Sequence, residues 1–444
     1  MGNSRDIALE ILYRVWEQEG KSHLLLSRAF REHPELTERD RAFITGLVHG
    51  SLENQLLLDF RLNEVSKLPA EKLKPWVRTV LRMGLYQLLF LDRVPAAAVG
   101  NESVRFIRGK KLEGLSGYVN GVLRGAARKE DWKMLPPELS LGLPQALWQR
   151  LRRDFGEAGA WRIGEGLRTP GPLSLRVNLS RGSAEEAVRL FAKEGYTARP
   201  LAAAPAALVL TRTPEAEHRL PLEETTPFKK GLVQVQDVSS QLAVALAAPA
   251  KGARVLDLCA APGGKSLHAA DLVGETGSVT ACDLTEDKIR LLEENIRRSG
   301  FAHIRAVRRD AAVFVPEDEA AYDLVIADLP CSGLGVMGRK PEIRFRVSEE
   351  SIRELAALQR RILEQAVRYV KPGGRLLFST CTMTAEENLA NGTWLAERPE
   401  LRAADLSAAL PQGGPWMSWG PGLQLFPGEG WDGFYISLFE RVKA

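Results

Sequence analysis

The chain of 444 residues is 45% hydrophobic and 26% charged, with a net charge of +4. This composition predicts two to four packed domains with a polar surface. There is no apolar signal peptide at residues 1–6 and no membrane-spanning run, so we expect a cytoplasmic protein that does not bind a membrane.

The first 130 residues have the pattern of helices. Ile7, Ile11 and Val15 recur every four positions, and Thr37 begins a TERD stretch that is typical of a helix start. This segment holds 21 Lys or Arg and 16 Asp or Glu, a net charge of +5, while the remainder is close to neutral. A nucleic-acid contact surface would explain the excess, but a solvated helix face would explain it equally well.

A smaller domain of mixed structure is expected next. Residues 135–145 (LPPELSLGLPQ) indicate a linker, because proline and glycine interrupt any periodic pattern. Strands are predicted over residues 173–179 and 207–211, with a helix over 183–195 between them. A second loose stretch is expected over 213–231.

From Val233 onward, strands alternate with amphipathic helices. Strands are predicted over 254–260, 278–284, 304–310, 322–330 and 374–382, and helices over 287–300 and 350–370. Such alternation is typical of a doubly wound parallel sheet that binds ligands at the carboxyl ends of its strands. The tail from residue 423 to 442 has the pattern of a hairpin added to the edge of the sheet.

A ligand loop and three carboxylates fall at these strand ends. The stretch DLCAAPGGKS (257–266) joins a strand to a helix, and Gly263 with Gly264 allows a close backbone approach to a ligand. The spacing does not fit a nucleotide-binding Walker loop. Asp283, Asp310 and Asp328 end the next three strands; a carboxylate after one strand often caps a helix, but three beside a glycine turn favour a nucleoside ligand.

The four cysteines all lie between Cys259 and Cys381. Disulfides and zinc are disfavoured, because the chain is long and has no CxxC pair, so we expect no metal. Cys282 is expected to be buried, and Cys259 either packs or lines the ligand loop. Cys331 and Cys381 occur in polar turns where a thiolate could form.

These motifs resemble a known family of enzymes. DLCAAPGGKS, ACDLTEDK, RRDAAV, DLPCSGLGV and STCTMTAEEN are similar to the ordered motifs of S-adenosylmethionine-dependent RNA cytosine-5 methyltransferases. Over nearly its full length the chain resembles the bacterial 16S rRNA methyltransferases of the Sun, Fmu or RsmB type, whose helical N-terminal domain is similar to NusB. ERDRAFITGLVHGSLENQLLLDF, LRMGLYQLLFLDRVP and GYVNGVLR carry the N-terminal part of that resemblance.

The resemblance implies three domains. They are an all-α NusB-like RNA-binding domain (1–134), a small α+β RNA-binding or linker domain (145–230) and a C-terminal α/β Rossmann-like methyltransferase domain (231–444). The implied activity is transfer of a methyl group from S-adenosylmethionine to carbon 5 of one cytosine of 16S rRNA, naked or partly assembled, by a protein that we expect to be a monomer. A cytosine-5 methyltransferase of tRNA or another RNA, and a non-catalytic RNA-binding assembly factor, remain as alternatives.

The resemblance also implies roles for individual residues. Cys381 would be the nucleophile and Cys331 the group that aids product release, although the spacing alone does not decide which of the two attacks. Asp328 would lie near the sulfonium and the base, and Lys265 would balance charge unless it is an ordinary solvated lysine at a helix start. The residues implied to bind the cofactor are Cys259, Ala260, Ala261, Pro262, Gly263, Gly264, Lys265, Asp283 (ribose), Asp310 (adenine) and Asp328.

Overall fold

The computed structural model describes residues 4–169, 171–201, 204–213, 220–410, 414–428 and 430–443. It divides into two compact units, one formed by residues 1–168 with 337–346 and the other by residues 169–336 with 347–444. Part of the loose stretch expected over 213–231 lies outside the described residues, at 214–219.

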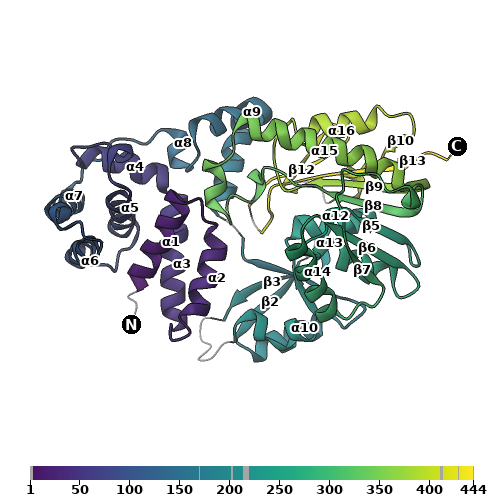
Figure 1. Cartoon of the computed structure of the whole chain (residues 1–444), viewed down its shortest axis with the longest axis horizontal. Coiled ribbons are helices and arrows are strands. Elements are labelled where there is room, and N and C mark those ends of the chain that lie inside the picture. The colour runs from purple at the N-terminus through teal and green to yellow at the C-terminus, as the bar shows by residue number, and fades with distance from the viewer. Residues whose placement is uncertain are drawn as a thin grey trace. The chain divides into compact units, whose positions relative to one another are not determined.

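The first unit is helical, as the sequence predicts (Figure 1). Its elements are α1 (Ser4–Glu17), α2 (Ser22–Glu32), α3 (Glu38–Glu53), α4 (Gln55–Val65), α5 (Pro75–Phe90), α6 (Ala96–Gly109), α7 (Ser116–Arg128), α8 (Pro137–Ser140) and α9 (Gln145–Arg168), with short 3-10 turns η1 (Ala70–Lys72) and η2 (Glu113–Leu115). The predicted stripe of Ile7, Ile11 and Val15 is buried in one apolar core. Thr37 caps α3, because its side chain accepts a hydrogen bond from the Asp40 amide while Asp40 bonds back to Thr37.

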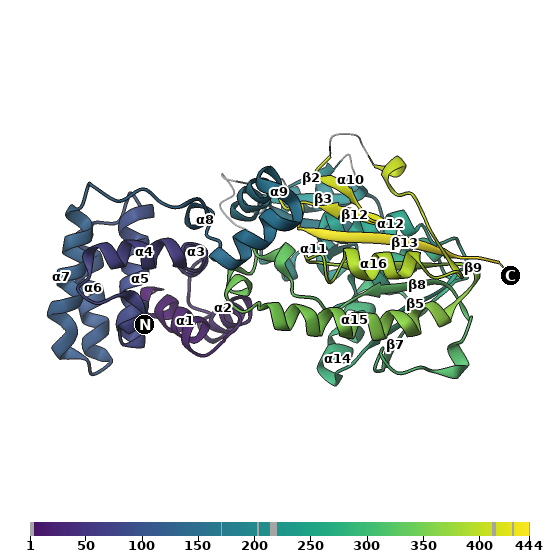
Figure 2. The same ribbon diagram turned by 90° about the horizontal axis from the view of Figure 1, so that it is seen from above.

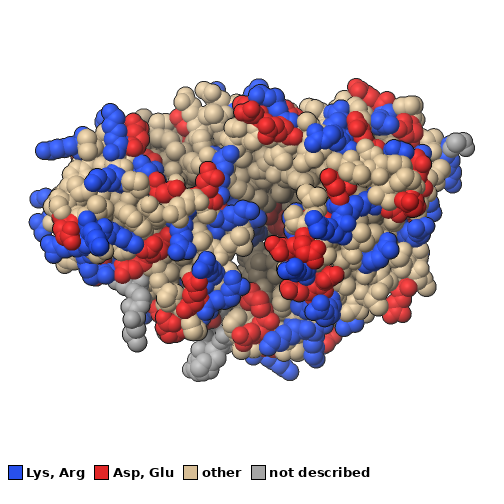
Figure 3. All heavy atoms as spheres, viewed as in Figure 1, with Lys and Arg blue, Asp and Glu red and all other residues tan. Residues whose placement is uncertain are grey.

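The charges of this unit are largely balanced within it. Arg105 pairs with Asp6, Arg78 with Glu17 and Lys110 with Glu10. On the face shown in Figure 3, positive and negative side chains are interspersed over the helical unit. These three basic side chains are therefore paired with carboxylates of α1.

Residues 337–346, which follow the Cys331 segment in the chain, pack within the helical unit. They contain the 3-10 helix η6 (Pro341–Phe345), whose Glu342 accepts hydrogen bonds from the backbone amide and the hydroxyl of Ser22, each at 3.0 Å. The guanidinium of Arg344 is buried and donates to the carbonyl of Gly142 at 2.7 Å. Burial lowers the pKa of Arg344 to about 10, with the charge of Glu53 opposing that change.

A small sheet opens the second unit. Its strands β1 (Leu173–Val177), β2 (Tyr196–Leu201), β3 (Ala204–Arg212) and β4 (Val233–Val235) are antiparallel in the order β2-β3-β1-β4. Helix α10 (Ala184–Lys193) and the shorter η3 (Leu222–Glu224) and α11 (Thr226–Lys229) accompany it. Leu175, Phe191 and Leu210 lie in its core. The sequence predicts β1, α10 and β3, but not the edge strands.

The large sheet has the order β11-β12-β13-β9-β8-β5-β6-β7. Five strands are parallel: β5 (Arg254–Asp257), β6 (Ser278–Asp283), β7 (Ile304–Arg308), β8 (Tyr322–Asp328) and β9 (Val370–Thr380). The predicted C-terminal hairpin is present as β12 (Gly422–Leu425) and β13 (Phe434–Arg441), which runs antiparallel to β9; β11 (Trp416–Trp419) and β10 (Leu401–Ala403) are further antiparallel strands.

Helices flank this sheet in two groups (Figures 1 and 2). One group contains α12 (Val238–Ala247), α13 (Gly264–Val273) and α14 (Glu286–Ser299), and the other contains α15 (Glu349–Tyr369) and α16 (Leu389–Ala396). Short 3-10 turns occur at η4 (Pro316–Asp318), η5 (Leu334–Val336) and η7 (Ser407–Ala409). The apolar strand runs read from the sequence form the core of this sheet, so the expected multidomain fold with a C-terminal α/β domain is confirmed.

Candidate active site

The predicted ligand loop joins β5 to α13 at the carboxyl edge of the parallel strands. Gly263 has a φ of +109°, a left-handed conformation that favours glycine. A Cβ atom at this position would also lie 2.8 Å from Leu292 Cδ1. Glycine at 263 therefore lets the chain enter α13 at Gly264 with its first amides at the sheet edge.

Asp283 at the end of β6 supports this loop. Its carboxylate accepts hydrogen bonds from the amides of Ala261 (3.0 Å) and Leu284 (2.8 Å) and from Lys288 Nζ (2.9 Å). The side chain thus fixes the position of the loop relative to β6. Its contact with a ribose remains a prediction.

Asp257, at the end of β5, is a carboxylate that the sequence analysis did not select as a site residue. One oxygen accepts a hydrogen bond from the Ser266 hydroxyl at 2.6 Å, while the buried Oδ1 has no partner among the described residues. Burial raises the pKa of Asp257 to about 7, and the nearby charge of Asp328 adds to this effect. An unpaired buried acceptor beside the glycine turn suits a ligand with an amino group, which is a feature of S-adenosylmethionine.

Asp310 lies beyond the end of β7 and is exposed. Its carboxylate accepts a hydrogen bond from the amide of Ala312 at 2.9 Å, which stabilises the turn after the strand. No contact in the structure bears on the predicted interaction with adenine.

Lys265 is not a solvated lysine. Its side chain is 8% exposed, and Nζ lies 2.6 Å from Asp328 and 2.8 Å from the hydroxyl of Ser240. The other oxygen of Asp328 accepts a hydrogen bond from Ser379 Oγ at 2.8 Å. The surface alternative for Lys265 is therefore wrong, because the first turn of α13 directs this side chain toward the end of β8. Ser240 and Ser379 were not identified from the sequence.

The structure brings Cys331 and Cys381 together. They follow the ends of the adjacent parallel strands β8 and β9, where Asp328 is in register with Ser379. Their Sγ atoms lie 3.3 Å apart, which is a hydrogen-bonding distance for sulfur. Two cysteines that belong to separate sequence motifs are thus in contact through their sulfur atoms.

The two thiols of this pair are not equivalent. The hydrogen bond with Cys381 and the burial of the side chain raise the pKa of the Cys331 thiol well above its usual range, and the charge of Glu387 acts in the same direction. A thiolate is therefore disfavoured at Cys331 in these surroundings, and the expectation of a thiolate at Cys381 remains a prediction. Either thiol can be the donor of the contact between the two sulfur atoms.

The other two cysteines have different surroundings. Cys282 in β6 is fully buried, as expected, and burial raises its pKa to about 12. Cys259 lies in the ligand loop and is partly buried, and burial also raises its pKa. Both side chains are thus thiols at neutral pH.

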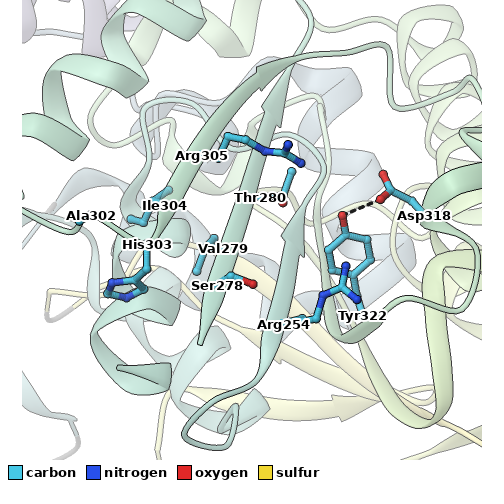
Figure 4. Close-up of a pocket in the computed structure, with 10 residues that line it drawn as sticks. All are labelled: Arg254, Ser278, Val279, Thr280, Ala302, His303, Ile304, Arg305, Asp318 and Tyr322. Carbon is cyan, nitrogen blue, oxygen red and sulfur yellow. Dashed lines mark hydrogen bonds between the residues drawn. The ribbon is translucent and has the colours of Figure 1, made fainter. Parts of the chain in front are cut away.

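A separate pocket lies at the opposite edge of the parallel strands (Figure 4). Arg254, Ser278 and Tyr322, the first residues of β5, β6 and β8, line it together with Arg305, and Tyr322 donates a hydrogen bond to Asp318 at 2.8 Å. None of the predicted site residues lines this pocket, because they all follow the carboxyl ends of their strands.

Among the described residues, no group of three or more His, Cys, Asp or Glu side chains is arranged to hold a metal ion. Likewise, none of the described helices is both long and apolar enough to cross a membrane.

Family models match three stretches of the chain. The model of the NusB family matches residues 2–128, and a ferredoxin-like domain of RsmF/B-like methyltransferases matches residues 143–217. The model described as 16S rRNA methyltransferase RsmB/F matches residues 243–440. All the predicted site residues lie within this last match.

Similar proteins extend over the whole chain. The probable ribosomal RNA small subunit methyltransferase B of Bacillus subtilis (strain 168) is 34% identical, with 98% of each chain covered. A probable ribosomal RNA small subunit methyltransferase B of Synechocystis is 32% identical, with 100% of each chain covered. Among solved structures, the chain in the crystal structure of PH0851 has 26% sequence identity and a TM-score of 0.83, with 99% of each chain covered.

Proposed function

The chain belongs to the RsmB/F family of 16S rRNA methyltransferases, and from this premise we propose that it methylates carbon 5 of one cytosine through a covalent bond to Cys381. The observation that carries this proposal is the 3.3 Å contact between Cys331 and Cys381 beside Asp328. With two thiols at the strand ends, one can add to the pyrimidine while the other assists release of the product.

The chemistry explains why a thiol is needed. When bound, S-adenosylmethionine supplies an electrophilic methyl group on its sulfonium. Carbon 5 of cytosine is a poor nucleophile until a thiolate adds to carbon 6 and makes the ring an enamine. After carbon 5 is methylated, loss of its proton expels the thiolate and restores the aromatic ring, so that Cys381 is regenerated.

The asymmetry of the two thiols supports Cys381 as the nucleophile. The surroundings of Cys331 raise the pKa of its thiol, and its sulfur lies 3.3 Å from that of Cys381. A thiol at this distance can donate a hydrogen bond to a Cys381 thiolate, which would stabilise the negative charge before attack and when the thiolate leaves. Cys331 therefore suits a role in product release rather than in attack.

Asp328 and Lys265 would act on the base. Lys265 holds one oxygen of Asp328 and Ser379 holds the other, so the carboxylate has a fixed orientation. A fixed carboxylate can accept hydrogen bonds from the polar edge of cytosine and favour addition at carbon 6. Lys265 then compensates the charge that this partly buried carboxylate brings into the site.

The cofactor is proposed to bind along the loop from Cys259 to Lys265, with Asp283 at its ribose, Asp310 at its adenine and Asp328 near its sulfonium. The unpaired oxygen of Asp257 supports the methionine end of this assignment, because the amino group of the cofactor would satisfy it. Asp257 is thus an addition to the residues selected from the sequence.

The proposed substrate is small-subunit rRNA that is naked or only partly assembled. A target base must leave its stack to reach a buried thiol, and RNA loops allow this at low cost. The proposed domains at 1–134 and 145–230 would contact the RNA, and that at 231–444 would carry the chemistry. Methylation of isolated 16S rRNA, but not of mature subunits, is expected; the reverse would contradict this part of the proposal.

Trapping of the covalent bond tests the mechanism. Cys381→Ala is expected to abolish formation of 5-methylcytosine, while Cys331→Ala is expected to accumulate a protein–RNA adduct that survives denaturing electrophoresis. Cys282→Ala is the matched control, because Cys282 is buried away from the pair, and it should methylate RNA at close to the wild-type rate. An adduct formed by Cys381→Ala would reverse the assignment of the two cysteines.

The same assay separates the alternative functions. Methylation of tRNA in preference to 16S rRNA would favour a different RNA substrate. Binding of RNA without transfer of a radiolabelled methyl group would favour an assembly factor. Mapping of 5-methylcytosine in rRNA from cells that lack the protein would identify the target base.

A further inference from the structure

Glu387 is a buried carboxylate with no role in the mechanism described above. It follows β9 and Cys381 in the chain, and its side chain is fully buried. Oε1 accepts hydrogen bonds from the Ser332 amide (2.9 Å) and from Gln359 Nε2 (3.0 Å). Oε2 accepts hydrogen bonds from the Ser332 hydroxyl (2.5 Å) and the Thr384 hydroxyl (2.8 Å). A carboxylate with four donors is firmly held in one orientation.

Three of these four donors come from the two cysteine segments. Ser332 follows Cys331 directly, and Thr384 lies three residues after Cys381. The hydroxyls of Ser332 and Thr382 also lie 2.6 Å apart, so the two segments are connected beside the carboxylate as well as through it. Glu387 therefore connects the backbone that carries one thiol to the segment that carries the other.

The remaining donor fixes the network to a helix. Gln359 in α15 is fully buried, and its Nε2 donates to Glu387 and also to the carbonyl of Pro330 at 2.8 Å. Pro330 and Ser332 are the two neighbours of Cys331, and both are thus held by the same network. The backbone on each side of the Cys331 sulfur has little freedom to move.

Burial of a charged carboxylate in this position costs more free energy than burial of a neutral hydrogen-bonding side chain. The donors to Glu387 are amides and hydroxyls rather than cations, so the charge is stabilised only by dipoles. An apolar residue in this place would leave these buried donors unpaired, whereas the two oxygens of a carboxylate accept from all four at once.

We propose that Glu387 is a positioning residue for methyl transfer, which holds the Cys331 segment against the Cys381 segment. This inference rests on the proposed covalent mechanism. It adds a residue that touches neither the base nor the cofactor and that acts through Cys331.

The electrostatics of the pair agree with this role. The titratable groups that face Cys331 are Cys381 and Glu387, and the negative charge of Glu387 raises the pKa of the Cys331 thiol. Without the charge of Glu387, we expect the pKa of the Cys331 thiol to be lower.

The test compares Glu387→Gln with wild type and with Glu397→Gln, a matched substitution at an exposed position. Glu387→Gln is expected to lower kcat for methylation at least ten-fold, with the KM for RNA and the affinity for S-adenosylmethionine within about two-fold of wild type. Alkylation of Cys331 by iodoacetamide, followed by peptide mass spectrometry, is expected to begin at lower pH in this variant. Glu397→Gln should change none of these values.

A second variant keeps the test decisive if Glu387→Gln does not fold. Thr384→Val removes one of the four donors at nearly constant volume, and it is expected to lower kcat about three- to ten-fold. A folded Glu387→Gln protein with wild-type kcat would overturn the inference. So would a loss of thermal stability with no change in the pH profile of Cys331 alkylation, since that result indicates a purely structural role.

The outcomes also separate this inference from the proposed function. The alkylation profile is measured on free enzyme and does not depend on any methylation. If wild type forms no 5-methylcytosine, the proposed function fails, whatever the profile shows. If wild type is active and the profile of Glu387→Gln is unchanged, only the role of Glu387 fails.

Discussion

The ammonium group of Lys265 lies 2.6 Å from the carboxylate of Asp328 and joins the first turn of α13 to the end of β8. The two residues are 63 positions apart in the chain. One belongs to the proposed cofactor loop and the other precedes Cys331 by three residues. The ion pair therefore connects the region of the methyl donor with that of the thiols.

Removal of the Lys265 charge tests this connection. Lys265→Met keeps the length and apolar stem of the side chain but leaves the partly buried Asp328 without its cation. We expect the rate of a single methylation turnover to fall on the order of 100-fold, because Asp328 loses its fixed orientation. Lys251→Met, at an exposed position, is the control and should retain the wild-type rate. Equal rates for the two variants would show that the ion pair has no part in the chemistry.

Much of this site could be predicted because its signals are local. The apolar runs that end in Asp283 and Asp328 identify buried strands, and the glycine pair after Asp257 identifies a turn. Parallel strands bring their carboxyl ends to one edge, so the proximity of Cys331 and Cys381 follows from two separate motifs.

Other features depend on partners that no local pattern reveals. The burial of Lys265 and Glu387 is set by distant donors and acceptors such as Ser240 and Ser332. Charged residues are seldom fully buried, so the sequence alone favours exposure of both side chains to solvent. Ser332 and Glu387, for example, are 55 residues apart in the chain, and no spacing pattern in the sequence predicts their hydrogen bond.

Two of the elements that the sequence does not predict have a local physical reason. Helix α9 contains Gly156, whose φ of +71° interrupts the helical pattern between two halves. Strand β2 is an edge strand and contains Pro200, a residue that cannot donate to a sheet and usually argues against a strand. In both cases tertiary packing outweighs the local signal.

The glycine turn makes a prediction about cofactor affinity. Gly263→Ala places a side chain at a φ of +109° and brings its Cβ to 2.8 Å from Leu292 Cδ1, so the loop must move. We expect the dissociation constant for S-adenosylmethionine to rise about ten-fold or more in a calorimetric titration. Gly274→Ala is a matched control, because Gly274 also has a positive φ but has open space around it at the far end of α13. It should lower stability without changing the affinity.

The carboxyl of Asp257 makes the stability of the ligand-free protein depend on pH. Its pKa is about 7 in the folded state, against 3.8 for the ordinary group, so folding favours the protonated form. The contribution of this carboxyl group to the free energy of unfolding is fully present below about pH 4 and is lost as the pH rises through 7. Asp257→Asn removes this titration, and we expect its melting temperature relative to wild type to increase between pH 5 and pH 8. The same pH dependence in both proteins would contradict the assignment.

The last prediction concerns the segment after the Cys331 region, which packs within the helical unit. Glu342 is 4% exposed and accepts two hydrogen bonds from Ser22 at the start of α2. Glu342→Ala leaves those buried donors unpaired, so we expect a loss of about 1–3 kcal/mol in the free energy of unfolding. Hydrogen exchange of the Ser22 amide, which donates to Glu342, should also become faster. Glu130→Ala, at an exposed position of the same unit, should change neither quantity. Unchanged exchange at Ser22 in Glu342→Ala would show that this contact does not hold residues 337–346 in place.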